Sequence, residues 1–117
     1  MNWDILVDRI KYLRDDVRKY KYDFLTNLKM RKDFDDELRG LFERYEFEGK
    51  PFCLVIVDIN KLHDINREQG YGAGDKLIKS VADCLADKLS TCGGAELYRI
   101  GGDEFAILIK KDSIKNA

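Results

Sequence analysis

The sequence predicts an α/β (α+β) domain, in which a central sheet carries flanking helices and follows an N-terminal coiled-coil-like helix. Three observations predict this fold class. Residues 52–59 form a continuous apolar run that is typical of a buried strand. Residues 96–100 and 104–110 form two apolar runs around a turn with two glycines, which indicates a β-hairpin. Apolar residues at helical spacing precede and separate these strands, and they predict the helices.

The composition limits the chain to one core and excludes several classes of partner. Its 117 residues carry 21 basic and 22 acidic side chains in an interspersed pattern, for a net charge of −1. Neither DNA binding nor direct membrane insertion is therefore expected. The apolar runs are too short to cross a bilayer and the acidic N-terminus is unlike a signal peptide, so we expect a cytoplasmic protein. Because His63 is the only histidine, any metal would be held by oxygen, as Mg²⁺ or Mn²⁺ is.

Residues 1–22 are expected to form an N-terminal helical stalk. Apolar residues alternate at steps of three and four, the a/d pattern of a coiled coil, over about three heptads. They are Trp3, Leu6, Ile10, Leu13, Val17, Tyr20 and Phe24. Two interpretations remain open: the helix pairs with a partner, or it folds back onto its own domain.

The next two elements are a helix and a strand. Phe34 begins a helical apolar spacing that Gly49 and Pro51 stop. Residues 52–59 then read as a strand covered on both faces, with Asp58 near its end.

Two more helices are expected before the hairpin. A short helix runs from residue 60 to about residue 69, and the glycine-rich stretch 70–74 breaks it. A longer helix then runs from residue 74 to about residue 90, and two consecutive glycines at 93–94 follow its end. Residues 23–117 thus make up one domain.

Three acidic residues are expected to meet where the strand and the hairpin lie side by side. Asp58 lies among apolar residues at the end of its strand, where a lone carboxylate is costly. Asp103 and Glu104 follow Gly101 and Gly102, which permit positive φ and leave room for another group to approach. A glycine-glycine-acid turn alone is usually only a turn. Three converging carboxylates would suit one or two Mg²⁺ ions and a phosphate-bearing substrate.

Three motifs in the same order resemble the GGDEF domain of diguanylate cyclases. The sequence GGDEF stands at residues 101–105, and DFLTNLKMRKDF at residues 23–34 resembles the opening of that family. VDINKLHDINREQGYGAGD at residues 57–75 resembles its metal-binding and guanine-binding segment. The resemblance covers about residues 23–110, and we expect the C-terminal part of the family's domain to be missing.

The resemblance implies a fold similar to nucleotidyl-cyclase and polymerase palm domains. It also implies an enzyme that condenses two GTP molecules into cyclic di-GMP and releases pyrophosphate by two-metal chemistry. In that reading Asp58, Glu104 and the backbone carbonyl of Ile59 would bind Mg²⁺ or Mn²⁺. Asp103 would help to activate the attacking 3′-hydroxyl, which makes Asp103 and Glu104 the catalytic candidates.

The resemblance also assigns substrate-binding positions. Asn66 and Asp75 match the residues that read the guanine edge, while Gly101 and Gly102 would let the nucleotide lie against the backbone. His63 stands where the family has a phosphate-facing lysine. Because the product joins two nucleotides, the family reaction needs two domains, which implies a homodimer through the N-terminal helix and a sensor or effector domain fused to it.

The sequence departs from the family pattern at several positions. Asn60 replaces an aspartate and His63 replaces a lysine. An alternative function therefore stays open: a catalytically degenerate GGDEF module that binds GTP or dimerises and regulates a fused partner domain. In a third interpretation the acids are purely structural.

Overall fold

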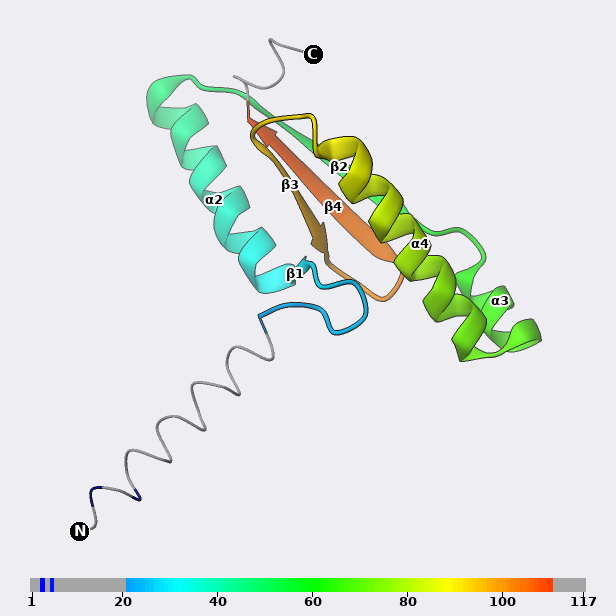
Figure 1. Cartoon of the computed structure of the whole chain (residues 1–117). Coiled ribbons are helices and arrows are strands. Elements are labelled where there is room, and N and C mark those ends of the chain that lie inside the picture. Colours follow the sequence, from blue (N-terminus) through cyan, green and yellow to red (C-terminus); the bar gives the residue numbers. More distant parts are fainter. Residues whose placement is uncertain (1–2, 4, 6–20, 111–117) are drawn as a thin grey trace.

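The computed structural model describes residues 21–110, together with Trp3 and Ile5 (Figure 1). Most of the predicted heptad segment lies outside these residues, so the helical stalk stays a prediction. Phe24 is an exception, because it lies in a turn and is fully exposed. The helical spacing therefore does not extend to Phe24. Among the described helices, none is both long and apolar enough to cross a membrane.

A four-stranded mixed sheet organises the fold, in the order β1-β3-β4-β2. Strand β3 (Ala95–Arg99) and strand β4 (Glu104–Lys110) form the predicted antiparallel hairpin. Strand β2 (Phe52–Asp58) pairs antiparallel with β4, and the short strand β1 (Lys29–Met30) pairs in parallel with β3. The predicted α/β fold class, a central sheet with flanking helices, is confirmed.

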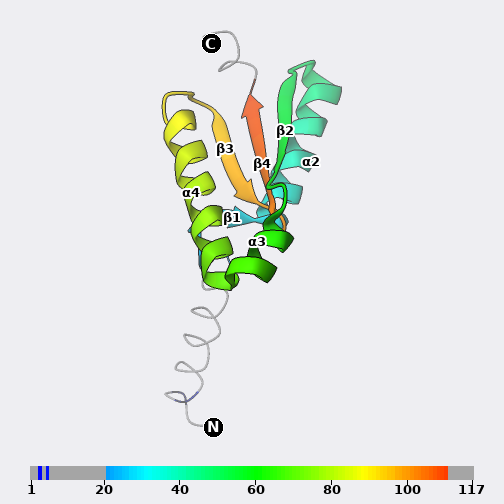
Figure 2. The same cartoon turned by 90° about the vertical axis from the view of Figure 1, so that its right-hand side faces the viewer.

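Helices cover both faces of the sheet. Figures 1 and 2 show α2 (Arg31–Glu48) on one face and α4 (Tyr71–Leu89) on the other, with α3 (Leu62–Gln69) beyond one end of the sheet. Successive β4 side chains alternate between two core clusters, as the pleat of a strand requires. Phe105 and Ile107 belong to the cluster that includes residues of α4, while Ala106 and Leu108 belong to the cluster that includes residues of α2.

Strand β2 lies at an edge of the sheet, and side chains on both of its faces are partly exposed, so the prediction of a strand covered on both faces is wrong. Leu54, Val55 and Ile56 are 41%, 37% and 52% exposed. A continuous apolar run is compatible with a central strand and with an edge strand. The sequence of β2 alone therefore could not show whether its side chains are buried or exposed.

The helix boundaries correct a second expectation. Helix α2 ends at Gly49, which adopts the left-handed conformation with φ 68°, as its predicted stop signal implied. Helix α4, however, begins at Tyr71 and contains Gly72 and Gly74, so only Gly70 separates it from α3. The glycine-rich stretch is thus largely helical.

Candidate active site at the signature turn

The end of β2 and the start of β4 bring the acidic residues together. Asp58 is the last residue of β2 and pairs with Glu104, the first residue of β4. Directly opposed residues of an antiparallel pair project from the same face of a sheet. The next amide, that of Ile59, donates a hydrogen bond of 2.8 Å to the carbonyl oxygen of Asp103. The signature turn therefore lies beside Asp58, as the sequence predicted.

The charge of these carboxylates is not compensated by any basic side chain among residues 21–110. Desolvation at the end of the strand, and then the adjacent Asp103 carboxylate, raise the pKa of Asp58 above its ordinary value. Within the described part of the chain, Asp58, Asp103 and Glu104 form no ion pair with a basic side chain. A cation bound here would relieve the repulsion between Asp58 and Asp103.

The two glycines of the turn act through their small size. Neither Gly101 nor Gly102 has a positive φ, so that expectation was wrong. The side chain of Glu104 folds back along Gly101, and its Oε2 would lie 3.7 Å from a Cβ atom at that position. Gly102 has no neighbour within 4 Å of such an atom. The turn therefore leaves space at Gly102, where a substrate could approach the backbone.

The largely buried side chain of Arg99 binds the signature turn, and the sequence analysis did not predict this role. One terminal nitrogen of Arg99 donates hydrogen bonds to both carboxylate oxygens of Asp23, at 3.0 and 2.9 Å. The other donates to the carbonyl oxygen of Gly102, at 2.8 Å. The Arg99 and Asp23 side chains are only 16% and 15% exposed. The signal in the sequence was a basic residue placed two positions before the GGDEF signature.

Asp23 also organises the segment that precedes α2. Its carboxylate accepts hydrogen bonds from the backbone N–H and the hydroxyl of Thr26, at 2.9 and 2.7 Å. Burial by itself would raise the pKa of Asp23, but the bonds from Thr26 and Arg99 outweigh burial and lower it. An ionised Asp23 therefore connects the loop before α2 to the signature turn.

The predicted guanine-binding residues come from α3 and α4. The Oδ1 atom of Asn66 is buried and has no hydrogen-bond partner among the described residues. It lies so close to Gly74 that a Cβ atom there would overlap the amide. Asp75, the next residue, is exposed, as is His63 on α3.

The structure thus places the predicted site residues in two groups. Asp58, Ile59, Asp103 and Glu104 gather at the join of β2 and β4. Asn66 and Asp75 lie on the two helices that continue from that end of the sheet (Figures 1 and 2). Both groups are therefore near the same end of the molecule.

The donor set fits a divalent cation only in part. Nowhere in the described residues do three or more His, Cys, Asp or Glu side chains gather in a way that could hold a metal ion. Three converging carboxylates were expected, whereas the proposed set is two carboxylates, Asp58 and Glu104, with the carbonyl of Ile59. These are the oxygen donors that Mg²⁺ and Mn²⁺ prefer, and the remaining ligands would be water or phosphate oxygens.

Comparison with known proteins identifies the family. The family model described as "Diguanylate cyclase, GGDEF domain" matches residues 20–117. The probable diguanylate cyclase DgcE of Escherichia coli is 30% identical over 107 residues, which is 92% of this chain and 10% of that protein. This chain thus spans only a small part of that relative.

Similar solved structures belong to the same family. The GGDEF domain of DgcB from Caulobacter crescentus, in complex with c-di-GMP, is 34% identical with a TM-score of 0.71. The match covers 78% of this chain and 51% of that one. A structure of the coiled coil and GGDEF domain of DgcB gives 30% identity and a TM-score of 0.74, over 97% of this chain and 62% of that one. The chain belongs to the GGDEF domain family of the diguanylate cyclases.

Proposed function

We propose that this chain is the catalytic core of a diguanylate cyclase, which joins two GTP molecules into cyclic di-GMP and releases two pyrophosphates. The observation that carries this proposal is the uncompensated acidic join of Asp58, Asp103 and Glu104. Within it, the Asp58 and Glu104 carboxylates and the Ile59 carbonyl are oxygen donors that suit a cation and a phosphate-bearing substrate. Membership of the GGDEF family supports the same reaction.

Each proposed step uses a group of this chain. The amide of Asn66 and the carboxylate of Asp75 would bind the guanine edge, which offers one acceptor and two donors. Asp103 would accept the proton of the 3′-hydroxyl of one GTP. That oxygen attacks the α-phosphorus of the second GTP, and the bond to pyrophosphate breaks; the reaction then repeats in the opposite sense. When bound, Mg²⁺ or Mn²⁺ supplies positive charge that stabilises the phosphate oxygens.

The reaction requires two copies of the domain. We propose that the N-terminal heptads supply this homodimer and that a fused sensor or effector domain regulates it. A cytoplasmic location would give this domain access to its GTP substrate.

The first test is a calorimetric titration of the chain with a non-hydrolysable GTP analogue and Mg²⁺. We expect saturable binding that Asp75→Ala weakens at least tenfold, because the guanine loses its carboxylate partner. Asp83→Ala, which removes an exposed carboxylate further along α4, is the control. Equal affinity for the parent and Asp75→Ala would contradict the proposed guanine site.

A second function is favoured by the departures from the family pattern at Asn60 and His63. With an amide in place of a carboxylate and an imidazole in place of an ammonium group, the domain could bind GTP without cyclising it and so regulate a fused partner. Chromatography of products after incubation with GTP and Mg²⁺ separates the two functions. Cyclic di-GMP indicates the cyclase, whereas tight analogue binding without product indicates the regulatory module.

A further inference from the structure

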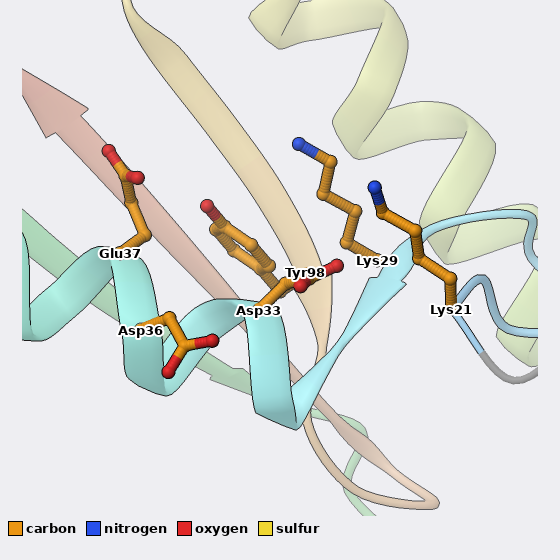
Figure 3. Close-up of a pocket in the computed structure, with 6 residues that line it drawn as sticks. All are labelled: Lys21, Lys29, Asp33, Asp36, Glu37 and Tyr98. Carbon is orange, nitrogen blue, oxygen red and sulfur yellow. The ribbon is translucent and has the colours of Figure 1, made fainter. Parts of the chain in front are cut away.

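A cavity lies on the face of the sheet that α2 covers, and the cyclase reaction does not use it. Its volume is about 230 Å³ (Figure 3). Three acidic residues project from α2 on one side and two lysines lie on the other, with a tyrosine of β3 between them. The lining residues are Lys21, Lys29, Asp33, Asp36, Glu37 and Tyr98.

The charged groups of this cavity are not paired with one another. None of its two lysines and three acids takes part in an ion pair with another described residue. The Oδ2 atom of Asp33 is buried and lacks a hydrogen-bond partner among those residues. A buried carboxylate oxygen without a donor is costly, so a ligand that donates a hydrogen bond here would be stabilising.

Tyr98 supplies a second polar group to the cavity. The residue is 98% buried, with 2% exposure, and its ring packs edge-on against Phe34 at 5.6 Å between centroids. In Figure 3 its hydroxyl lies between Glu37 and Lys29. Burial, followed by the nearby carboxylates, raises the pKa of Tyr98 above its usual range, so the phenol remains protonated.

From this arrangement we propose that the cavity binds a free basic α-amino acid, such as lysine. The ligand's carboxylate would face Lys21 and Lys29, and its ammonium groups would face Asp33, Glu37 and the oxygen of Tyr98. Three carboxylates against two ammonium groups leave the cavity one negative charge, which a basic amino acid neutralises. This proposal goes beyond the cyclase function and does not rest on it.

Other ligand classes fit less well. A metal ion is disfavoured because the acids are not grouped closely enough to hold one. A nucleotide would bring phosphate toward the acids of α2, and a diamine would leave both lysines without a partner. The volume is below the roughly 300–1,000 Å³ of drug-sized sites, which indicates a small metabolite.

The test is a calorimetric titration of the chain with three matched probes. L-lysine carries all the proposed groups, cadaverine lacks the carboxylate, and L-norleucine lacks the side-chain ammonium. We expect L-lysine to bind at least tenfold more tightly than either of the others. The proposal is overturned if L-lysine shows no saturable binding at millimolar concentrations, or if cadaverine binds equally well.

Variants assign the binding to the cavity. Tyr98→Phe and Asp33→Asn should each weaken L-lysine binding about tenfold, because each alters one polar partner while keeping the shape of the side chain. Glu43→Gln, an exposed charge on the same helix outside the cavity, should leave it unchanged. If Tyr98→Phe fails to fold, L-lysine binding by Asp33→Asn alone tests whether the ligand occupies this cavity. Undiminished L-lysine binding in a folded Asp33→Asn variant would overturn the proposal. Retained L-lysine binding in Asp75→Ala would show that this cavity is distinct from the guanine site.

Discussion

Arg99 joins two segments that lie 76 positions apart in the sequence, because its guanidinium binds both Asp23 and the Gly102 carbonyl. Asp23→Asn leaves this largely buried guanidinium without its charged partner. We expect the free energy of unfolding to fall by about 2–4 kcal/mol, measured by urea denaturation. Cyclic di-GMP synthesis should fall by more than the decrease in the folded fraction, because Arg99 would hold the signature turn less firmly.

The exposed pair Arg67–Asp64 is the control for this substitution. Its side chains are 66% and 48% exposed, so Arg67→Met should cost less than about 0.5 kcal/mol. If Asp23→Asn and Arg67→Met lowered the free energy of unfolding equally, the buried pair would contribute no more stability than the exposed pair.

The same pair predicts a pH dependence. The pKa of Asp23 is lowered in the folded chain, so its stabilising effect is present above its unfolded value of about 3.8 and is lost as pH falls through the lower, folded value. Stability measured from pH 6 down to pH 2 should therefore decline more steeply in the parent than in Asp23→Asn. Parallel curves would contradict this.

Gly74 offers a matched pair of substitutions within one helix. A Cβ atom at Gly74 would overlap the Asn66 amide, whereas one at Gly72 would meet nothing within 4 Å. Gly74→Ala should destabilise the chain by about 1–3 kcal/mol and weaken binding of the GTP analogue, because Asn66 must move. Gly72→Ala should stay within about 1 kcal/mol of the parent. Equal behaviour in thermal unfolding and calorimetry would argue against a role for the Asn66–Gly74 contact.

The proposed metal ligands predict a change in thermal stability. Mg²⁺ should raise the melting temperature, and Glu104→Gln should remove most of that rise, because an amide is a weaker ligand for a hard cation than a carboxylate. Glu96→Gln, on the neighbouring strand, is the control. A rise that survives in Glu104→Gln would place the metal elsewhere.

Much of the residue-level site could be predicted because its members lie in short local motifs. Asp58, Asp103 and Glu104 were expected to meet, since a strand end and a hairpin turn can pair through the backbone alone. The Asp23–Arg99 contact could not be predicted from spacing, because it depends on the packing of distant segments. The packing role of Gly74 was missed for the same reason. The sequence does not show whether a glycine ends a helix or makes room for a side chain from another helix.

At the scale of elements, the outer edge of β2 pairs with no other described strand, and we expect this edge to affect how the chain behaves in solution. Its exposed residues combine apolar side chains with unpaired backbone groups, which favours edge-to-edge pairing. Ile56→Lys, at a site 52% exposed, should reduce self-association with a loss of stability below about 1 kcal/mol. Light scattering at increasing protein concentration measures this.

A lysine at a buried neighbouring position serves as the contrast. Ile107, on β4, is 6% exposed, so Ile107→Lys should unfold the chain rather than improve its solubility. Unchanged self-association of folded Ile56→Lys would mean that this edge does not mediate the contact.

The strands and helices themselves were largely predictable. The short apolar run of β4 indicates a strand, the apolar residues at helical spacing in α2 indicate a helix, and Gly49 marks the end of α2. The exposure of β2 was not predictable from its own residues, because edge and central strands can have the same apolar pattern.

At the scale of the whole molecule, the proposed reaction depends on two domains meeting. Replacing both Leu13 and Val17 with Lys places charges in the predicted heptad seam, so we expect monomers in sedimentation and a loss of cyclic di-GMP synthesis. Binding of the GTP analogue to each domain should persist. A double variant that remains dimeric would show that the heptad seam is not the interface.

The parallel pairing of β1 with β3 also bears on how this chain acquires its structure. During translation β1 leaves the ribosome well before β3, and Asp23 leaves it 76 residues before Arg99. Such sequence-distant contacts slow folding, because a long loop must close before they form. Strand β1 therefore finds its neighbour only after α2, β2, α3 and α4 have all been synthesised, and the Arg99 contacts that hold the signature turn form no earlier.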